Sequence, residues 1–141
     1  MGIQERKERE KEQRREEILN AAQKIFFEKG LQNATMDEIA EAAELSKGTL
    51  YLYYGSKEDL YFSVMMRGLE ILHDMFVQST EEASTTFEAI RQLGPTYYEF
   101  FQRHRNFFRM FNYFQYPGMH KQVSEEMRQL CNNQSQKLWS V

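Results

Sequence analysis

Cysteine, proline and long apolar runs are scarce in this chain of 141 residues, and each scarcity limits the structures and locations that are possible for the protein. The single cysteine, Cys131, cannot form a disulfide within the chain, which fits a reducing compartment such as the cytoplasm. Only two prolines, Pro95 and Pro117, interrupt the chain, so long helices are possible. No apolar run approaches the roughly 20 residues that cross a bilayer, and none follows Met1 as in a signal peptide. We therefore expect a cytoplasmic protein without a membrane partner.

Groupings that support catalysis or metal binding are also missing. The three histidines, His73, His104 and His120, are far apart, and no cluster of cysteines or carboxylates accompanies them. There is no Ser-His-Asp order, no glycine-rich phosphate loop and no paired-carboxylate spacing. We expect no metal site, no cofactor and no enzymatic activity.

The charge balance is slightly acidic, with 18 Lys and Arg against 21 Asp and Glu and a formal net charge of −3. This balance disfavours a nucleic-acid partner only mildly, because phosphate contacts depend on where the cations lie. Residues 5–17, ERKEREKEQRREE, are of mixed sign. One interpretation is a solvated extension of the first helix, supported by acid-first pairs four residues apart. The other is a basic arm that touches phosphates through Arg14 or Arg15.

Apolar residues recur with helical spacing and never with the alternation of a strand, so the chain is predicted to be all-α. A first helix from Ile18 ends at Gly30, and a loop over 31–34 follows. Thr35 begins a capping box with Glu38 and starts a short second helix. The remaining predicted helices cover 47–54, 57–78, 85–104 with a disturbance at Gly94-Pro95, 106–116, and 119–139 after a break at Pro117-Gly118, with a polar loop over 79–84.

Two short helices joined by a tight turn at Glu44-Leu45, packed on a longer first helix, describe a helix-turn-helix. The second helix of that motif enters the major groove, and its N-terminal residues meet base edges. Lys47 supplies a cation there, Gly48 lets a backbone approach closely, and Thr49 offers a hydroxyl and a methyl group. These residue types suit contacts with DNA bases.

Further groups around this helix suit the phosphate backbone. The phenols of Tyr51 and Tyr53 can donate hydrogen bonds to phosphates. The helix N-termini at Thr35 and Lys57 offer free N–H groups and a favourable dipole on either side of the groove.

Residues 14–60 resemble the DNA-binding domain of the tetracycline-repressor (TetR) family, through ILNAAQKIFFEKG, ATMDEIAEAAELSKGTLYLYY and GSKEDLY. By position, the resemblance implies DNA contacts at Thr35, Lys47, Gly48, Thr49, Tyr51, Tyr53 and Lys57. Glu44 departs from the family, which often has glycine there, and a left-handed turn at a non-glycine residue costs about 1–2 kcal/mol. Tyr54 also departs, since phenylalanine is commoner at that position.

The resemblance implies that the second half binds an inducer and forms a homodimer. Its aromatic run from Tyr97 to Tyr116 can wall a cavity for a flat, greasy ligand, or can simply form the core. The residues that we expect to face a ligand are Phe62, Met66, Leu69, His73, Phe101, Phe108, Phe111 and Tyr113.

These features predict two domains: a helix-turn-helix DNA-binding domain over 1–56 and a helical ligand-binding and dimerisation domain over 57–141. Because the family continues with two more helices, we expect the second domain to be C-terminally truncated. The predicted function is a homodimeric repressor that a small hydrophobic or aromatic ligand releases from double-stranded operator DNA. The alternative is a small-molecule-binding helical protein with a vestigial DNA-binding head. The sequence leaves open the operator, the ligand, and repression versus activation.

Overall fold

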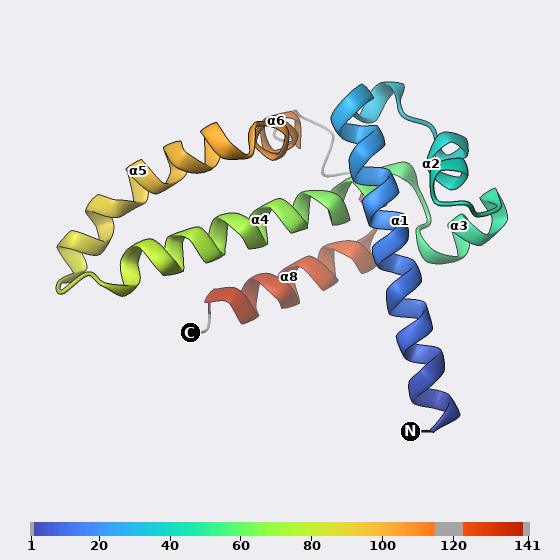
Figure 1. Ribbon diagram of the computed structural model, residues 1–141, viewed down its shortest axis with the longest axis horizontal. Coiled ribbons are helices and arrows are strands. Elements are labelled where there is room, and N and C mark those ends of the chain that lie inside the picture. Colours follow the sequence, from blue (N-terminus) through green and yellow to red (C-terminus); the bar gives the residue numbers. More distant parts are fainter. Residues whose placement is uncertain (1, 115–122, 140–141) are drawn as a thin grey trace. The chain divides into compact units, whose positions relative to one another are not determined.

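A computed structural model describes residues 2–114 and 123–139, and every regular element in these ranges is an α-helix (Figure 1). The all-α prediction is confirmed. The helices are α1 (Ile3–Asn33), α2 (Met36–Ala42), α3 (Lys47–Tyr53), α4 (Lys57–Glu81), α5 (Thr86–Arg103), α6 (Arg105–Phe114) and α8 (Glu125–Trp139). None of the described helices combines the length and the apolar character that crossing a bilayer requires. The predicted break at Pro117-Gly118 lies outside the described residues.

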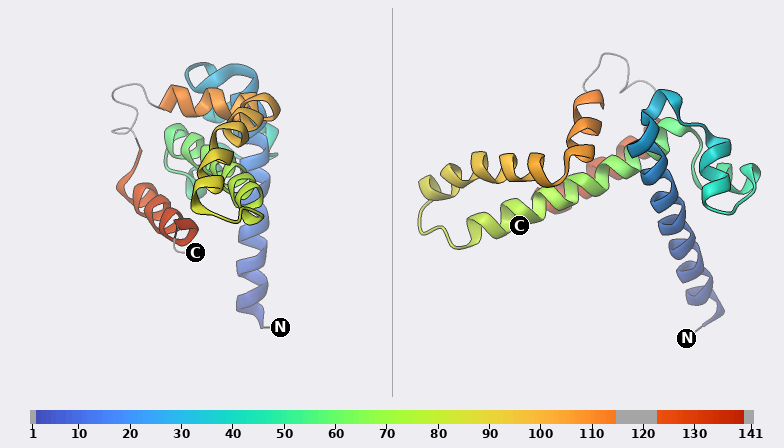
Figure 2. Two further views of the ribbon diagram at one scale, coloured as in Figure 1. Left: turned by 90° about the vertical axis from the view of Figure 1, so that its left-hand side faces the viewer. Right: turned by 45° about the horizontal axis from the view of Figure 1, so that its top comes forward.

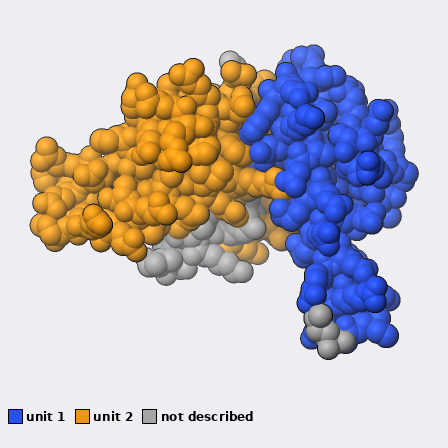
Figure 3. Space-filling view, in the orientation of Figure 1, with its two compact units in different colours: residues 1–64 blue, residues 65–141 orange. Residues whose placement is uncertain are grey.

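Two compact units divide the chain, unit 1 over residues 1–64 and unit 2 over residues 65–141 (Figure 3). The division falls within α4, whereas the domain limits expected from the sequence meet at residue 56.

The core of unit 1 lies along one face of α1. Ile18, Ala22 and Phe26 are buried and recur every four residues, which keeps them on one side of the helix. The ring of Phe26 meets that of Tyr61 edge to face, with centroids 5.2 Å apart. Other elements complete this core with fully buried side chains: Ile39 from α2, Leu50 from α3, and Leu60 and Val64 from the start of α4.

Helix α1 breaks where the sequence predicts but does not end there. Gly30 has φ +76°, a backbone conformation that glycine adopts without steric cost. The chain then resumes a helical turn to Asn33, so the predicted loop over 31–34 is wrong for most of its length. Leu31 and Ala34 are buried, and this turn is therefore packed into the core.

In unit 2, α5 contacts α6, and Figure 2 shows α5 returning alongside α4. Phe100, Phe107 and Met110 are buried. Gly68 lies against Phe107 so closely that a Cβ at position 68 would be 2.6 Å from Cδ1 of that ring. The absence of a side chain at Gly68 therefore permits the approach of the phenylalanine.

Two predicted interruptions in this unit differ in the structure: one begins later than predicted, and the other is absent. The loop predicted over 79–84 begins later, since α4 continues to Glu81 and the chain is non-helical from 82 to 85. The hydroxyls of Ser79 and Thr80 donate back to the carbonyl of Phe76, so these polar side chains are bonded within the last turns of the helix. Helix α5 runs through Pro95. The residue before the proline is Gly94, which has no Cβ to clash with the proline ring, and both residues are exposed to water.

Candidate nucleic-acid interface

The turn between α2 and α3 sets the direction in which α3 leaves the core. Glu44 has φ +58°, and it alone among the described non-glycine residues has a positive φ. The N–H of Leu45 donates to the carbonyl of Ala40 (2.9 Å) and the N–H of Glu44 to that of Glu41 (3.0 Å). This pair of bonds is a Schellman motif, with glutamate at the position that usually holds glycine. The left-handed turn expected at Glu44 is confirmed.

Side-chain caps fix the starts of the helices. The hydroxyl of Thr35 accepts from the N–H of Glu38 (3.1 Å), and that of Ser46 accepts from the N–H of Thr49 (3.1 Å). The Glu38 carboxylate, predicted to complete a capping box, instead accepts from the Lys29 ammonium (2.6 Å). This hydrogen bond lowers the pKa of Glu38 and ties α1 to α2.

Helix α3 presents a distinct outer face. Leu50 is fully buried and Tyr54 is 7% exposed, so these two side chains anchor the helix. Lys47 and Gly48 are exposed, and Tyr51 is 44% exposed, so the first turns of α3 face solvent as a recognition helix requires. Thr49 and Tyr53, also predicted to contact DNA, are half-buried beside this face.

Hydrogen bonds hold several predicted contact residues in place before any partner arrives. The ammonium of Lys47 pairs with the carboxylate of Asp37 (3.2 Å), which joins the first turns of α2 and α3. The ammonium of Lys57 donates to the carbonyl of Ala34 (3.0 Å), so the start of α4 adjoins the residue before Thr35. Each ammonium carries three donors and so keeps capacity for a phosphate oxygen.

One exposed residue on this face was not predicted from the sequence. Leu52 is 85% exposed, the most exposed of the large apolar side chains in the described parts of the chain. It follows Gly48 by four residues and therefore lies on the same outer face of α3. The signal was present in the sequence, because Leu50 and Tyr54 as inward anchors turn the residue between them outward. An apolar side chain here suits the methyl group of thymine.

The residues predicted to face a ligand are distributed over both units. Phe62 belongs to unit 1 and the others to unit 2. Phe101 and Phe108 meet edge to face with centroids 4.8 Å apart, while Phe111 stacks on Phe100 at 5.6 Å. The other candidates in unit 2 are buried or half-buried: Met66, Leu69, His73 and Tyr113. The ring contacts between α5 and α6 thus form two groups, one with Tyr97, Phe101 and Phe108 and the other with Phe100 and Phe111.

The fold of unit 1 and the exposed face of α3 define a helix-turn-helix protein. Residues 18–64 match the family model described as bacterial regulatory proteins, tetR family. Among curated proteins, the chain is 29% identical over 100 residues to the HTH-type transcriptional activator FasR of Mycolicibacterium smegmatis, covering 71% of this chain and 46% of that protein. It is 35% identical over 83 residues to the HTH-type transcriptional regulator SAUSA300_2515 of Staphylococcus aureus, covering 59% of this chain and 43% of that protein.

A solved structure agrees in fold. A TetR family transcription regulator from Marinobacter aquaeolei VT8 superposes with a TM-score of 0.66 at 21% identity, over 94% of this chain and 68% of that one. The chain spans less than half the length of the two curated relatives. Its match to the tetR family model covers residues 18–64, and its fold agrees with that of a TetR family regulator.

Proposed function

We propose that the chain is a transcriptional regulator that binds a double-stranded DNA operator through α3. The observation that supports this most directly is the outer face of α3, where Lys47, Gly48 and Tyr51 are exposed while Leu50 is fully buried. A short helix anchored on one side, with a cation and a glycine in its first turn, has the shape and chemistry of a major-groove reader. Because its partner is bacterial DNA, the protein acts in the cytoplasm.

The predicted contacts divide by role. Lys47, Gly48 and Thr49, at the start of α3, are proposed to meet base edges, and Tyr51 and Tyr53 to donate to phosphates. Thr35 and Lys57 lie at the starts of α2 and α4, and are proposed to hold the DNA backbone beside the groove. Phosphate contacts fix register and much of the affinity, whereas base contacts select the sequence.

We further propose that the regulator acts as a homodimer whose operator is released by a small hydrophobic or aromatic ligand bound in unit 2. Two recognition helices must then lie about 34–36 Å apart to read successive major grooves. The ring pairs Phe101–Phe108 and Phe100–Phe111 support an aromatic or apolar ligand class. A ligand that couples to DNA with about 1–3 kcal/mol would change operator affinity roughly 5–150-fold. Repression is the proposed outcome, although one relative carries the name of an activator.

The test begins with selection of bound fragments from a random DNA pool by the wild-type protein. Thr49→Ala and Tyr51→Ala are then measured on the selected operator. We expect each variant to lose about 1–3 kcal/mol, or roughly 5–150-fold in affinity. Tyr98→Ala is the matched control, because it removes another exposed tyrosine, 59% exposed, from unit 2.

Undiminished specific binding by both α3 variants would refute the assignment of DNA contacts. Weak binding by the wild type to its best selected fragment, without salt dependence, would instead favour a small-molecule-binding protein with a vestigial DNA-binding head. A screen of apolar and aromatic compounds for release of the selected operator tests the ligand proposal, and Phe108→Ala should reduce the response to any compound found.

A further inference from the structure

The first part of α1 is a helical extension that precedes the core of unit 1. Residues 3–17 are helical, and each of them is exposed. At about 1.5 Å per residue the segment is about 22 Å long. Figure 1 shows the N-terminal part of α1 projecting beyond the other elements of unit 1. The prediction that this segment extends the first helix is confirmed, and its surface belongs to the DNA-binding unit.

One side of this extension carries three of its cations and no acid. Lys7, Lys11 and Arg14 are spaced by four and three residues, which puts them on one side of a helix. With about 100° of rotation per residue, they lie within an arc of about 60°. No glutamate of residues 3–17 falls within this arc, although the segment as a whole has as many acids as bases. The extension therefore has one side that carries only cations, and all its glutamates lie outside that side, although its formal net charge is zero.

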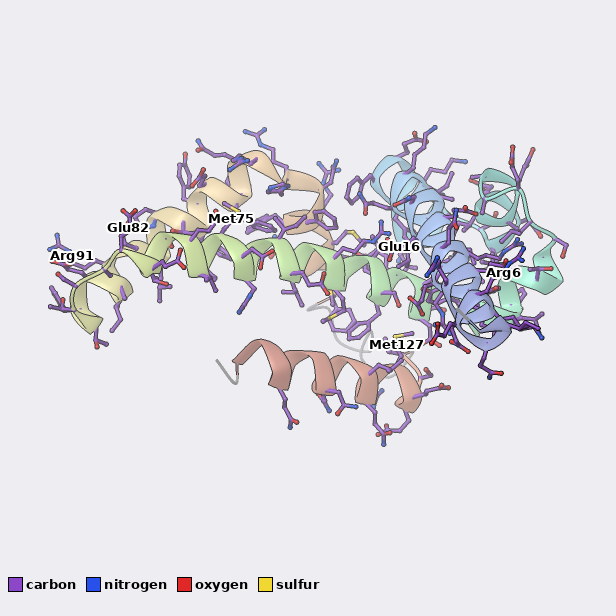
Figure 4. All side chains as sticks on the ribbon, turned by 60° about the horizontal axis from the view of Figure 1, so that its bottom comes forward. Arg6, Glu16, Met75, Glu82, Arg91 and Met127 are labelled. Atoms are coloured by element: carbon purple, nitrogen blue, oxygen red, sulfur yellow. The ribbon has the colours of Figure 1, made fainter. Side chains whose placement is uncertain are left out.

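The ion pairs of the extension leave these three cations available. Arg6 pairs with Glu10 and Arg15 with Glu12. Lys7, Lys11 and Arg14 make no side-chain hydrogen bond or ion pair with any residue in the described parts of the chain. Figure 4, where Arg6 and Glu16 are labelled, shows the side chains of α1 as sticks around its ribbon. Among the cations of the segment, these three form a continuous line that internal pairing does not neutralise.

This line has a fixed relation to the helix-turn-helix. Arg14 precedes Ile18 by four residues, and Ile18 precedes Ala22 by four, so the cations continue the buried face of α1. That face packs into the core of unit 1, where α1 contacts α2. The cations therefore extend from the side of α1 on which the helix-turn-helix lies. Along the axis, Arg14 is about 6 Å and Lys7 about 16 Å beyond Ile18.

We propose that Lys7, Lys11 and Arg14 bind the DNA phosphate backbone that flanks the half-site read by α3. This inference rests on the proposed function and adds a second DNA-binding surface to it. The three cations span about 10 Å, and each DNA strand presents a phosphate about every 3.4 Å of helix axis, so three contacts fit. The glutamates on the other side of the helix are repelled by phosphates and so orient the extension.

The test compares two triple variants on the selected operator. Lys7→Gln, Lys11→Gln and Arg14→Gln together remove the cation line, and glutamine keeps the helix propensity. Arg6→Gln, Arg9→Gln and Lys24→Gln together remove the same charge from other sides of α1. Far-ultraviolet circular dichroism checks that both variants keep their helices.

We expect the first triple variant to flatten the plot of log affinity against log salt by about 2.7 per protomer, at about 0.9 for each phosphate that a cation no longer neutralises. Between about 50 and 200 mM salt, the wild type should thus lose about 40-fold more affinity than this variant. The control should keep most of the wild-type slope. Shortening the DNA flanks should weaken the wild type and leave the first variant unaffected.

Equal slopes for the two triple variants would overturn the inference, because net charge alone would then explain the effect. An unchanged slope in the first variant, combined with its loss of binding to vesicles of anionic phospholipid, would assign the cations to a membrane surface instead. Both results leave α3 binding intact and so differ from failure of the proposed function, in which the wild type selects no operator.

Discussion

Replacement of Glu44 by glycine should stabilise the protein. Glu44 holds φ +58° in the turn that joins α2 to α3. A side chain in the left-handed region costs about 1–2 kcal/mol, and glycine removes that cost. Glycine also adds about 0.5–1 kcal/mol of backbone entropy to the unfolded chain, which opposes the gain. The expected net increase in the free energy of unfolding is about 0.5–1 kcal/mol.

The matched control is the same substitution three residues earlier. Glu41 is exposed like Glu44 but lies in α2, where glycine costs about 1 kcal/mol. Urea denaturation followed by far-ultraviolet circular dichroism would measure both variants, and Glu44→Ala would report the effect of removing the charge alone. The two glycine variants should move in opposite directions and differ by about 1.5–2 kcal/mol.

A loss of stability in Glu44→Gly similar to that in Glu41→Gly would refute the reasoning, because position 44 would then have ordinary backbone geometry. Operator binding gives an independent check. The Schellman hydrogen bonds use backbone atoms only, so Glu44→Gly should keep the direction of α3 and retain wild-type affinity.

Three further predictions concern both units. Gly68→Ala should cost about 1–3 kcal/mol of stability, because its Cβ would overlap the ring of Phe107. Thermal denaturation would measure the loss, and an unchanged melting temperature would contradict this close packing. Gly48→Ala should fold as well as the wild type, because its Cβ meets nothing within 4 Å, yet bind operator less tightly; equal affinity would exclude close backbone approach at that position. The hydrogen bond from Lys29 lowers the pKa of Glu38 from its ordinary value of 4.5. This bond therefore stabilises the fold above about pH 4.5, and its contribution is lost as the pH falls through the lowered pKa. The stability difference between wild type and Glu38→Gln should therefore shrink in acid, and a difference that is constant with pH would contradict this assignment.

Features that depend on neighbouring residues could be predicted from the sequence. The caps at Thr35 and Ser46, the break at Gly30 and the left-handed turn at Glu44 each arise within a few residues of chain. Local chemistry decides such features, so the helix-turn-helix followed from them, while the all-α class followed from the helical spacing of apolar residues.

Some predictions were wrong where a neighbouring residue offset the effect that a local sequence pattern usually has. The polar residues from Ser79 indicated a loop, but the hydroxyls of Ser79 and Thr80 bond back to the helix and the loop begins only at residue 82. Pro95 indicated a disturbance, but Gly94 before it removed the steric conflict. The contacts of Lys47 with Asp37 and of Lys57 with Ala34 join separate helices, so no local pattern could reveal them.

The two hydroxyls at the start of α3 couple stability to recognition. Ser46 accepts from the N–H of Thr49, and their hydroxyl oxygens lie 2.8 Å apart. Replacing Ser46 would therefore remove both the helix cap and a partner of the Thr49 hydroxyl, which is proposed to read DNA, whereas replacing Thr49 keeps the backbone N–H that the cap uses. Operator preference can therefore change at Thr49 without uncapping the helix, while Ser46 is constrained by the cap among descendants of this protein.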